Sequence, residues 1–354
     1  MRALFVGLGG IGQRHLRNLR TLLGADVRVS AYRVRGERHV IDDKLSVEAG
    51  ADVVEKYGVR VVLDLEGALA ERPDVVFVTN PTRLHVDVAL RAAKAGAHLF
   101  LEKPLSDSLE GVPELVRVVR EKKLVAFVGY QLRRHPGFLH LRSLLSQRVL
   151  GNVLSVSSEV GEYLPAFHPY EDYRRMYASR KDLGGGVTLS QIHEIDYLYA
   201  LFGAPERVFS LGGHLSSLEV DVDDVSSSLL ECRRADGAVI PVRLYQDYVT
   251  RPSRRLCRVV GDGGSIEWNL THGTLTWWGA EGTVMEERSY GDVPRNQLFL
   301  SELHHFLECI EKRRDPEVTV EDAAQSLSIA LALVESQKTG RVVTVSQENS
   351  VVPS

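Results

Sequence analysis

Lys103 is one of two residues whose type and position could support proton chemistry. It stands just beyond a strand-like apolar run at residues 98–101, and Pro104 restricts the backbone that follows. Ligands of open α/β sheets bind beyond the carboxyl ends of the strands, so an ammonium group here could hold a substrate hydroxyl. The alternative is a solvated surface lysine that pairs with Glu102.

His193 is the other candidate. It lies on a predicted helix over residues 189–202, and Ser190 and Tyr197 line the same seam beside the apolar stripe. Imidazole titrates near neutral pH, so His193 could accept a hydroxyl proton while hydride leaves the same carbon. A structural histidine that is bonded to Asp196 or Tyr197 fits the sequence equally well.

A glycine-rich turn provides a place for a hydride acceptor. Gly7, Gly9 and Gly12 follow the apolar run 3–6 and precede a stretch with helical periodicity. The first glycine of such a turn permits the tight bend, the second lets backbone N–H groups approach a pyrophosphate, and the third lets helix pack on strand. The order of strand, turn and helix predicts a dinucleotide site. The alternative is a turn with a purely steric role.

The residues after the second predicted strand indicate which dinucleotide binds. An acidic residue about 20 positions beyond the glycine turn usually holds the ribose 2′-hydroxyl of NAD. Here Tyr32 stands at that place and Arg33 follows it. A guanidinium group can pair with a 2′-phosphate, so the sequence predicts NADP as cofactor, with NAD as the alternative.

Two patterns of apolar residues divide the chain. Up to about residue 130, strands and helices alternate as in a doubly wound parallel sheet, with a polar excursion at 33–58 that should contain a short helix near 47–57. From residue 153, short turns join the strands, which predicts a large, open, mainly antiparallel sheet with helices near 189–202, 297–313 and 321–338 on one face. The expected strands are 3–6, 27–32, 59–63, 75–79, 98–101 and 125–129, then 153–160, 208–215, 226–232, 239–245, 256–260, 265–269 and 275–278.

Composition excludes several other classes of protein. The 354 residues are 44% hydrophobic and 25% charged, which suits a globular chain of two domains. A formal net charge of −4 gives no overall positive field for nucleic acid or an anionic membrane, and no apolar run approaches the about 18 residues that span a bilayer. The adjacent His304 and His305 point about 100° apart on a helix, so we expect no metal site. The sequence predicts a soluble, cytoplasmic protein.

The motifs between residues 79 and 104 resemble those of the Gfo/Idh/MocA oxidoreductases. Residues 79–85 (TNPTRLH) are similar to that family's T-P/N-x-x-H loop, and residues 102–104 to its E-K-P motif. The glycine turn precedes them, and three glycines at 184–186 lead to His193 at the family's spacing. The resemblance covers nearly the whole chain. It implies a Rossmann domain at 1–130, a substrate-binding and oligomerisation α/β domain at 131–345, and a flexible tail at 346–354.

The resemblance also implies roles for particular residues. Lys103 would orient the reacting hydroxyl and share its proton, with His193 as the second catalytic residue. The cofactor-binding residues expected from the turn, the spacing and the resemblance are Gly7, Gly9, Gly10, Ile11, Gly12, Tyr32, Arg33, Asn80, Pro81, Thr82, His85, Glu102, Lys103 and Gln131. The expected substrate-binding residues are Lys103, Arg133, Tyr163, His168, Arg174, Ser190 and His193.

Several of these substrate assignments have alternatives. Aromatic faces suit sugar rings and guanidinium groups suit carboxylate or phosphate, but the segment 162–182 could equally be an ordinary surface loop. Arg133 could equally be a surface charge. Many family members carry an aspartate four residues before the histidine, where this chain has Leu189, and neither Ser190 nor Gln191 is acidic. The base therefore stays open between His193, Lys103 and a tyrosine.

Taken together, the sequence predicts an NAD(P)-dependent oxidoreductase. Its substrate would be a secondary alcohol or the matching ketone of a sugar, a cyclitol or an anionic sugar derivative, and the open sheet would join subunits in a homodimer or homotetramer. The alternative is a dinucleotide-binding sensor or scaffold that kept the fold without turnover. The missing aspartate motivates that alternative.

Overall fold

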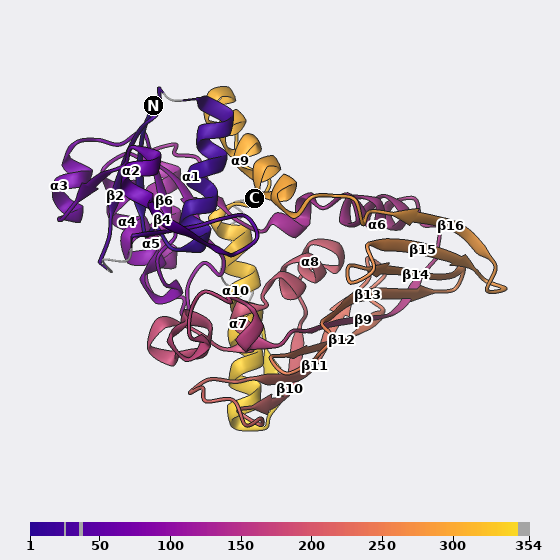
Figure 1. Cartoon of the computed structure of the whole chain (residues 1–354). Helices are drawn as coiled ribbons and strands as arrows, with labels where there is room; N and C mark the ends of the chain where they lie inside the picture. Colours follow the sequence, from indigo (N-terminus) through magenta and orange to yellow (C-terminus); the bar gives the residue numbers. More distant parts are fainter. Residues whose placement is uncertain (25, 35–37, 346–354) are drawn as a thin grey trace.

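The computed structural model describes residues 1–24, 26–34 and 38–345, and Figure 1 shows two sheets that lie in separate units. The N-terminal unit holds a six-stranded parallel sheet, and the C-terminal unit holds a nine-stranded sheet. The predicted fold class is therefore confirmed. The tail that we expect at residues 346–354 lies outside the described residues.

The first sheet has the strand order β5-β2-β1-β6-β7-β8, and every neighbouring pair is parallel. Its strands are β1 (Arg2–Val6), β2 (Arg28–Tyr32), β5 (Arg60–Val62), β6 (Val75–Val78), β7 (His98–Leu101) and β8 (Ala126–Val128). The helices of this unit are α1 (Gly10–Leu23), α2 (Val53–Tyr57), α3 (Leu65–Ala70), α4 (His85–Lys94) and α5 (Val112–Glu121). Order and direction are those of a dinucleotide-binding fold.

One phenylalanine from each of four neighbouring strands forms a buried row across the first sheet. Phe5, Phe77, Phe100 and Phe127 are register partners, and ring centroids of neighbours lie 4.4, 5.3 and 5.2 Å apart. Phe306, from α9 (Arg295–Lys312), packs edge-on against Phe100 at 5.4 Å. A helix from the C-terminal part of the chain therefore completes the core of the N-terminal sheet.

The second sheet has the order β16-β15-β14-β13-β9-β12-β11-β10-β17. Its strands are β9 (Val153–Gly161), β10 (Arg207–Gly213), β11 (Val225–Arg233), β12 (Val239–Asp247), β13 (Arg254–Gly261), β14 (Gly264–Asn269), β15 (Thr274–Gly279), β16 (Val284–Ser289) and β17 (Val343–Thr344). Only β9 and β12 pair in parallel among these described strands. Along β9, Val156, Ser158 and Val160 point into the protein, while Ser157 and Glu159 line a hollow on the other face.

Helices cover the inner face of this sheet. They are α6 (Pro136–Ser146), α7 (Val187–Ser190), α8 (His193–Phe202) and α10 (Val320–Thr339). Figure 1 shows α10 running from the N-terminal unit down to β10, and it contacts α5 and β8 at one end and β10 at the other. One hydrophobic core therefore runs through both units without a break at residue 130.

Two expected helices are partly wrong. Residues 47–52 form β4 (Val47–Asp52), which pairs with β3 (His39–Ile41), and only residues 53–57 are helical. Asp52 ends the strand and caps α2 by accepting from the N–H groups of Val54 and Glu55. The helix expected at 189–202 is interrupted between Ser190 and His193, which makes α7 and α8 separate elements.

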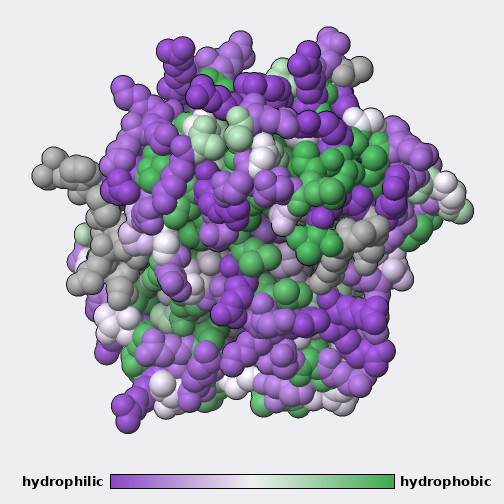
Figure 2. All heavy atoms as spheres, turned by 90° about the vertical axis from the view of Figure 1, so that its left-hand side faces the viewer, coloured by the Kyte–Doolittle hydropathy of each residue, from purple (hydrophilic) through white to green (hydrophobic). Residues whose placement is uncertain are grey.

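Figure 2 shows the face of the molecule formed by the N-terminal unit, where hydrophilic residues predominate and hydrophobic residues gather in small groups. Among the described residues, no helix is long and apolar enough to cross a bilayer.

Candidate active site

The glycine turn after β1 has the shape that a pyrophosphate needs. Gly7 has a φ of 101°, and a Cβ atom there would meet the Thr79 carbonyl oxygen at 2.7 Å. A Cβ atom on Gly12 would meet the Gly7 carbonyl oxygen at 2.6 Å, so helix and strand are packed tightly. A Cβ atom on Gly9 would meet nothing within 4 Å, and no side chain caps α1 there. The turn therefore fits a dinucleotide, with free space at Gly9 and the first N–H groups of the helix at Gly10 and Ile11.

The loop after β6 lies beside this turn. The Asn80 side-chain oxygen is buried and has no hydrogen-bond partner within the described residues, which fits a group that accepts from a bound ligand. His85 is buried, and its two ring nitrogens contact the Asn80 and Pro104 carbonyl oxygens at 2.8 Å. His85 therefore ties two loops together and does not reach a ligand itself. Pro81 and Thr82 lie between, with Thr82 buried.

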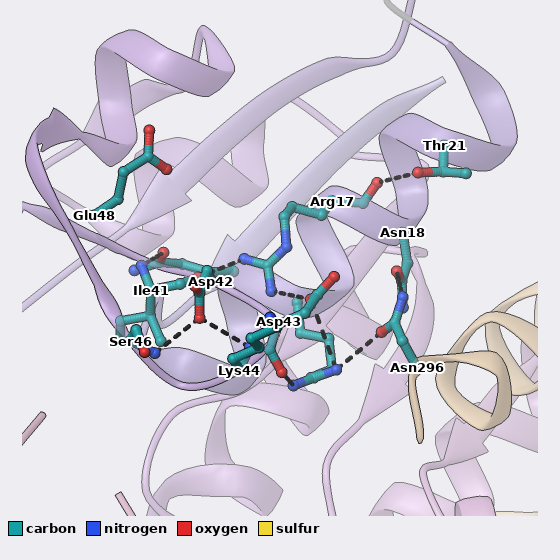
Figure 3. Close-up of polar contacts among 12 residues, drawn as sticks. Arg17, Asn18, Thr21, Ile41, Asp42, Asp43, Lys44, Ser46, Glu48 and Asn296 are labelled. Atoms are coloured by element: carbon teal, nitrogen blue, oxygen red, sulfur yellow. Dashed lines mark hydrogen bonds and ion pairs between the residues drawn. The ribbon is translucent and has the colours of Figure 1, made fainter. Parts of the chain in front are cut away.

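Residues 41–43, where β3 ends and the loop to β4 begins, are bonded to α1. Figure 3 shows Arg17 of α1 bonded to the Ile41 carbonyl oxygen at 2.7 Å and to Asp43 at 2.6 Å. Asp42 accepts from the N–H groups of Lys44 and Ser46, both at 2.8 Å. Asp42 is therefore used within its own loop, and Asp43 is used by α1. Tyr32 ends β2 and Arg33 follows it, and neither position holds an acid.

Lys103 points toward the second unit. Its Nζ donates to the Ser190 carbonyl oxygen at 2.8 Å, at the last residue of α7. Glu102 is held elsewhere, because its carboxylate contacts His15 Nε2 at 2.6 Å and accepts the Lys103 backbone N–H at 3.2 Å. The solvated Lys103–Glu102 ion pair, which was the alternative reading, is absent from the described contacts.

His193 begins α8, three residues after the carbonyl that holds Lys103. It is 5% exposed, and Nδ1 has no hydrogen-bond partner within the described residues. Burial, and next the positive charge of Lys103, holds the pKa of His193 well below its ordinary value. The imidazole is therefore in its neutral form at pH 7, with an unpartnered nitrogen at Nδ1. Neither Asp196 nor Tyr197 bonds to it, so the partners that were expected for a structural histidine are absent from the described contacts.

Those two neighbours of His193 serve the packing of α8. Tyr197 shares a hydrogen bond of 2.6 Å with Ser158 of β9. Asp196 binds Arg133 through two hydrogen bonds, at 2.8 and 2.7 Å, and accepts from Ser326 of α10 at 2.9 Å. Arg133 is only 6% exposed, and its guanidinium group binds the Asp196 carboxylate inside the protein. The expected contact between Arg133 and the substrate is therefore wrong.

The segment 162–182 brings only part of its expected residues toward the site. Arg174 is half exposed and binds Asp172 and Glu219 at the surface, so it is not a substrate contact here. Tyr163 lies under Arg251, whose guanidinium carbon is 4.2 Å from the ring centroid. His168 bonds Glu171 at 2.7 Å and stacks on Tyr170, whose hydroxyl would lie 2.6 Å from a Cβ atom on Gly10. The loop thus reaches the glycine turn.

The structure adds residues that sequence reasoning missed. Within the described part of the chain, buried polar atoms that lack a hydrogen-bond partner lie in the segment that holds Lys103 and on the strand end bonded to it: they are Gln191 Oε1, Gln246 Oε1 and the Oγ of Ser190, a residue that was already expected at the substrate. Tyr130 packs edge-on against His193 with ring centroids 5.8 Å apart. Gln131 begins the short 3-10 turn that follows Tyr130. Such atoms indicate a place built for a polar ligand. Tyr130 and Gln246 carry no sequence motif that could have identified them.

Within the described residues, no group of three or more histidine, cysteine or acidic side chains comes together as a metal site would require.

Comparison with known proteins agrees with this geometry. Residues 1–130 match the pattern of the Gfo/Idh/MocA oxidoreductase family, NAD-binding Rossmann fold, and residues 142–345 match the C-terminal alpha/beta domain of the same family. The chain belongs to this family. The sequence-based resemblance is therefore confirmed.

Relatives within the family include several enzymes of cyclic polyols and sugars. The chain is 26% identical to scyllo-inositol 2-dehydrogenase (NAD(+)) of Bacillus subtilis, over 97% of this chain and 96% of the relative. It is 27% identical to myo-inositol 2-dehydrogenase of Thermotoga maritima, over 98% and 99%. Among solved structures, levoglucosan dehydrogenase in complex with NADH and levoglucosan superposes with a TM-score of 0.79 at 21% identity, covering 98% of this chain and 100% of that one.

The turn itself can be tested by replacing Gly9 with alanine. The added methyl group meets no protein atom, and the φ of −72° suits alanine, so the melting temperature should stay unchanged. The same methyl group intrudes where backbone N–H groups would bind a pyrophosphate. We expect NADPH and NADH to bind about 10- to 100-fold more weakly, measured by fluorescence titration.

Gly12→Ala is the matched comparison, since its methyl group would collide with the Gly7 carbonyl oxygen and should lower both stability and affinity. Unchanged dinucleotide affinity in Gly9→Ala would contradict the assignment of the turn.

Proposed function

We propose that this chain is an NAD(P)-dependent dehydrogenase or reductase that acts on a secondary alcohol or the matching ketone of a sugar, a cyclitol or an anionic sugar derivative. The observation that carries the proposal is the convergence of Lys103 and the neutral His193 among unpartnered polar atoms, beside a glycine turn shaped for a dinucleotide. The inositol dehydrogenases among its relatives support the class of substrate.

The two residues have complementary tasks in this proposal. The bound nicotinamide supplies the hydride acceptor or donor. The Lys103 ammonium, held by the Ser190 carbonyl oxygen, donates a hydrogen bond to the reacting oxygen and favours its negative charge. His193 is neutral and lacks a partner at Nδ1, so it accepts the hydroxyl proton in oxidation and returns it in reduction.

The structure offers no carboxylate at position 189 to orient the imidazole, since Leu189 stands there. The competing function, a sensor or scaffold without turnover, would bind the dinucleotide and leave every sugar and cyclitol unchanged. A spectrophotometric assay of NADP and NAD reduction across a panel of cyclitols and sugars separates the two functions.

His193→Ala tests the proton step. Because no carboxylate supports the imidazole, we expect kcat to fall by about 10², the lower end of the range for a general base, with NADPH affinity nearly unchanged. The lowered pKa keeps the histidine neutral above pH 6.5, so kcat/KM should be level there and fall only as the pH drops through that lowered pKa. This acid limb should vanish in His193→Ala.

Lys103→Ala is the companion variant and should change both KM and kcat, because it removes a substrate contact together with a charge. A His193→Ala enzyme with unchanged kcat would leave Lys103 or a tyrosine as the proton acceptor.

We propose NADP as the preferred cofactor. Arg33 directly follows β2, where an acidic residue would favour NAD, while Asp42 binds within its own loop and Asp43 binds Arg17 of α1. Arg33→Asp should weaken NADPH binding about tenfold and shift preference toward NADH, because a carboxylate repels the 2′-phosphate. Arg28→Asp, at the exposed start of the same strand, is the control and should change neither affinity. Equal or tighter binding of NADH by the unaltered protein would refute the preference.

We also propose that the open face of the second sheet joins subunits in a homodimer or homotetramer. The inner face is covered by helices, whereas Leu211 and Leu229 on the outer face are 61% and 52% exposed. Sedimentation at micromolar concentration should show an oligomer, and Leu229→Arg should shift it toward monomer. Leu63→Arg, at a 90% exposed position of the N-terminal unit, should leave the mass unchanged. A monomeric unaltered protein would exclude this interface.

A further inference from the structure

We infer that Glu162 is a substrate-binding residue whose carboxylate accepts hydrogen bonds from a hydroxyl group of a cyclic polyol, next to the carbon that reacts. This inference rests on the proposed function and assigns a specificity-determining residue to the same site.

The place of Glu162 follows from the register of the second sheet. It is the residue after β9, and its backbone N–H still donates to the Asp247 carbonyl oxygen at 3.1 Å, which continues the pairing with β12. Inward-facing residues alternate along β9 up to Val160. Two residues further on, Glu162 takes the next inward position, on the face that α8 covers.

Hydrogen bonds link this strand end to Lys103. The Asp247 carbonyl oxygen that accepts from Glu162 also accepts from the Gln191 side chain at 3.0 Å. The Gln246 side chain donates to the Gln191 carbonyl oxygen at 2.9 Å, one residue after the Ser190 carbonyl that holds Lys103. Glu162 is thus anchored to the same short segment that positions the Lys103 ammonium.

A neighbouring cation, Arg255, binds another acid and leaves the Glu162 carboxylate available to a ligand. Arg255, the register partner of Val160, gives both of its hydrogen bonds to Glu194, at 2.6 and 3.0 Å. Although burial opposes it, the charges of Glu194 and Glu162 raise the pKa of Arg255. Glu162 therefore lies close enough to a partly buried cation, Arg255, to feel its charge, although Glu194 already binds that cation. Within the described residues, its carboxylate makes neither a hydrogen bond nor an ion pair.

This combination suits a hydroxyl-bearing ligand. A half-buried carboxylate with free lone pairs accepts strong hydrogen bonds from hydroxyl groups, and Arg255 offsets the repulsion that a second acid would add. The unpartnered oxygens of Gln191 and Gln246 lie along the same strand end, so this side of the site accepts hydrogen bonds from hydroxyl groups. We therefore expect neutral polyols to bind here with a hydroxyl directed at Glu162.

The test compares Glu162→Gln with the unaltered enzyme on cyclitols and anhydrosugars and on their monodeoxy analogues. The amide keeps the size of the side chain and removes the charge. We expect kcat/KM for the parent polyol to fall about 10- to 100-fold, mainly through KM. On the analogue that lacks the contacted hydroxyl, kcat/KM of the two enzymes should differ less than about threefold, since neither enzyme can form the hydrogen bond between that hydroxyl and residue 162. Glu162→Asp should recover part of the loss.

Glu281→Gln, at an exposed turn of the second sheet, is the control and should behave as the unaltered enzyme. Equal loss on every analogue would show a structural role and overturn the inference, as would unchanged kinetics in Glu162→Gln.

Calorimetric titration of the same panel into the NADPH-loaded protein separates the two proposals. Polyol binding that Glu162→Gln weakens, without turnover, would refute the proposed function and support the inference. Absence of both turnover and polyol binding would overturn both.

Discussion

The shared register of four parallel strands is the constraint on which the site depends. Phe5, Phe77, Phe100 and Phe127 stand side by side, so the residues two positions further on must also be level. Those positions hold Gly7, Thr79, Glu102 and Gly129, at the carboxyl ends of the strands. The hydrogen bond from Thr79 Oγ1 to the Gly7 carbonyl oxygen, at 2.7 Å, joins two neighbouring members of this row. A slip of one residue among β1, β6 and β7 would change the position of the turn relative to Lys103.

The interruption between α7 and α8 serves the second half of the site. In this interruption the Gln191 side chain donates to the Asp247 carbonyl oxygen, and the Gln191 carbonyl oxygen accepts from the Gln246 side chain. The Ser190 carbonyl oxygen accepts a hydrogen bond from Lys103. The buried pair of Arg133 and Asp196 then fixes α8 against the turn that follows β8. An irregular backbone and an internal ion pair together place His193 over the strand ends.

The sequence predicts local features well and distant partners poorly. The glycine turn, the parallel rhythm and the approach of Lys103 to His193 follow from spacing and from the family motifs, because each depends on a few neighbouring residues. Arg133 was misassigned because its partner, Asp196, is 63 positions away and carries no pattern that marks it. The strand at 47–52 was missed because its pairing with residues 39–41 outweighs local propensity. The inward position of Glu162 could not be predicted, because it depends on the register in which β9 pairs with β12 and β13.

The phenylalanine row also limits where the chain can be cut or joined to part of a relative. Phe306 belongs to the second part of the sequence but packs on Phe100 in the first, and α10 contacts both sheets. A chain cut after residue 130 would leave that aromatic surface facing water. The two parts are consequently not interchangeable modules, and a chimera that joins one relative's cofactor half to another's substrate half must match the α9 interface. Diversification of such a chain proceeds most readily through side chains at the strand ends, which leave the common core untouched.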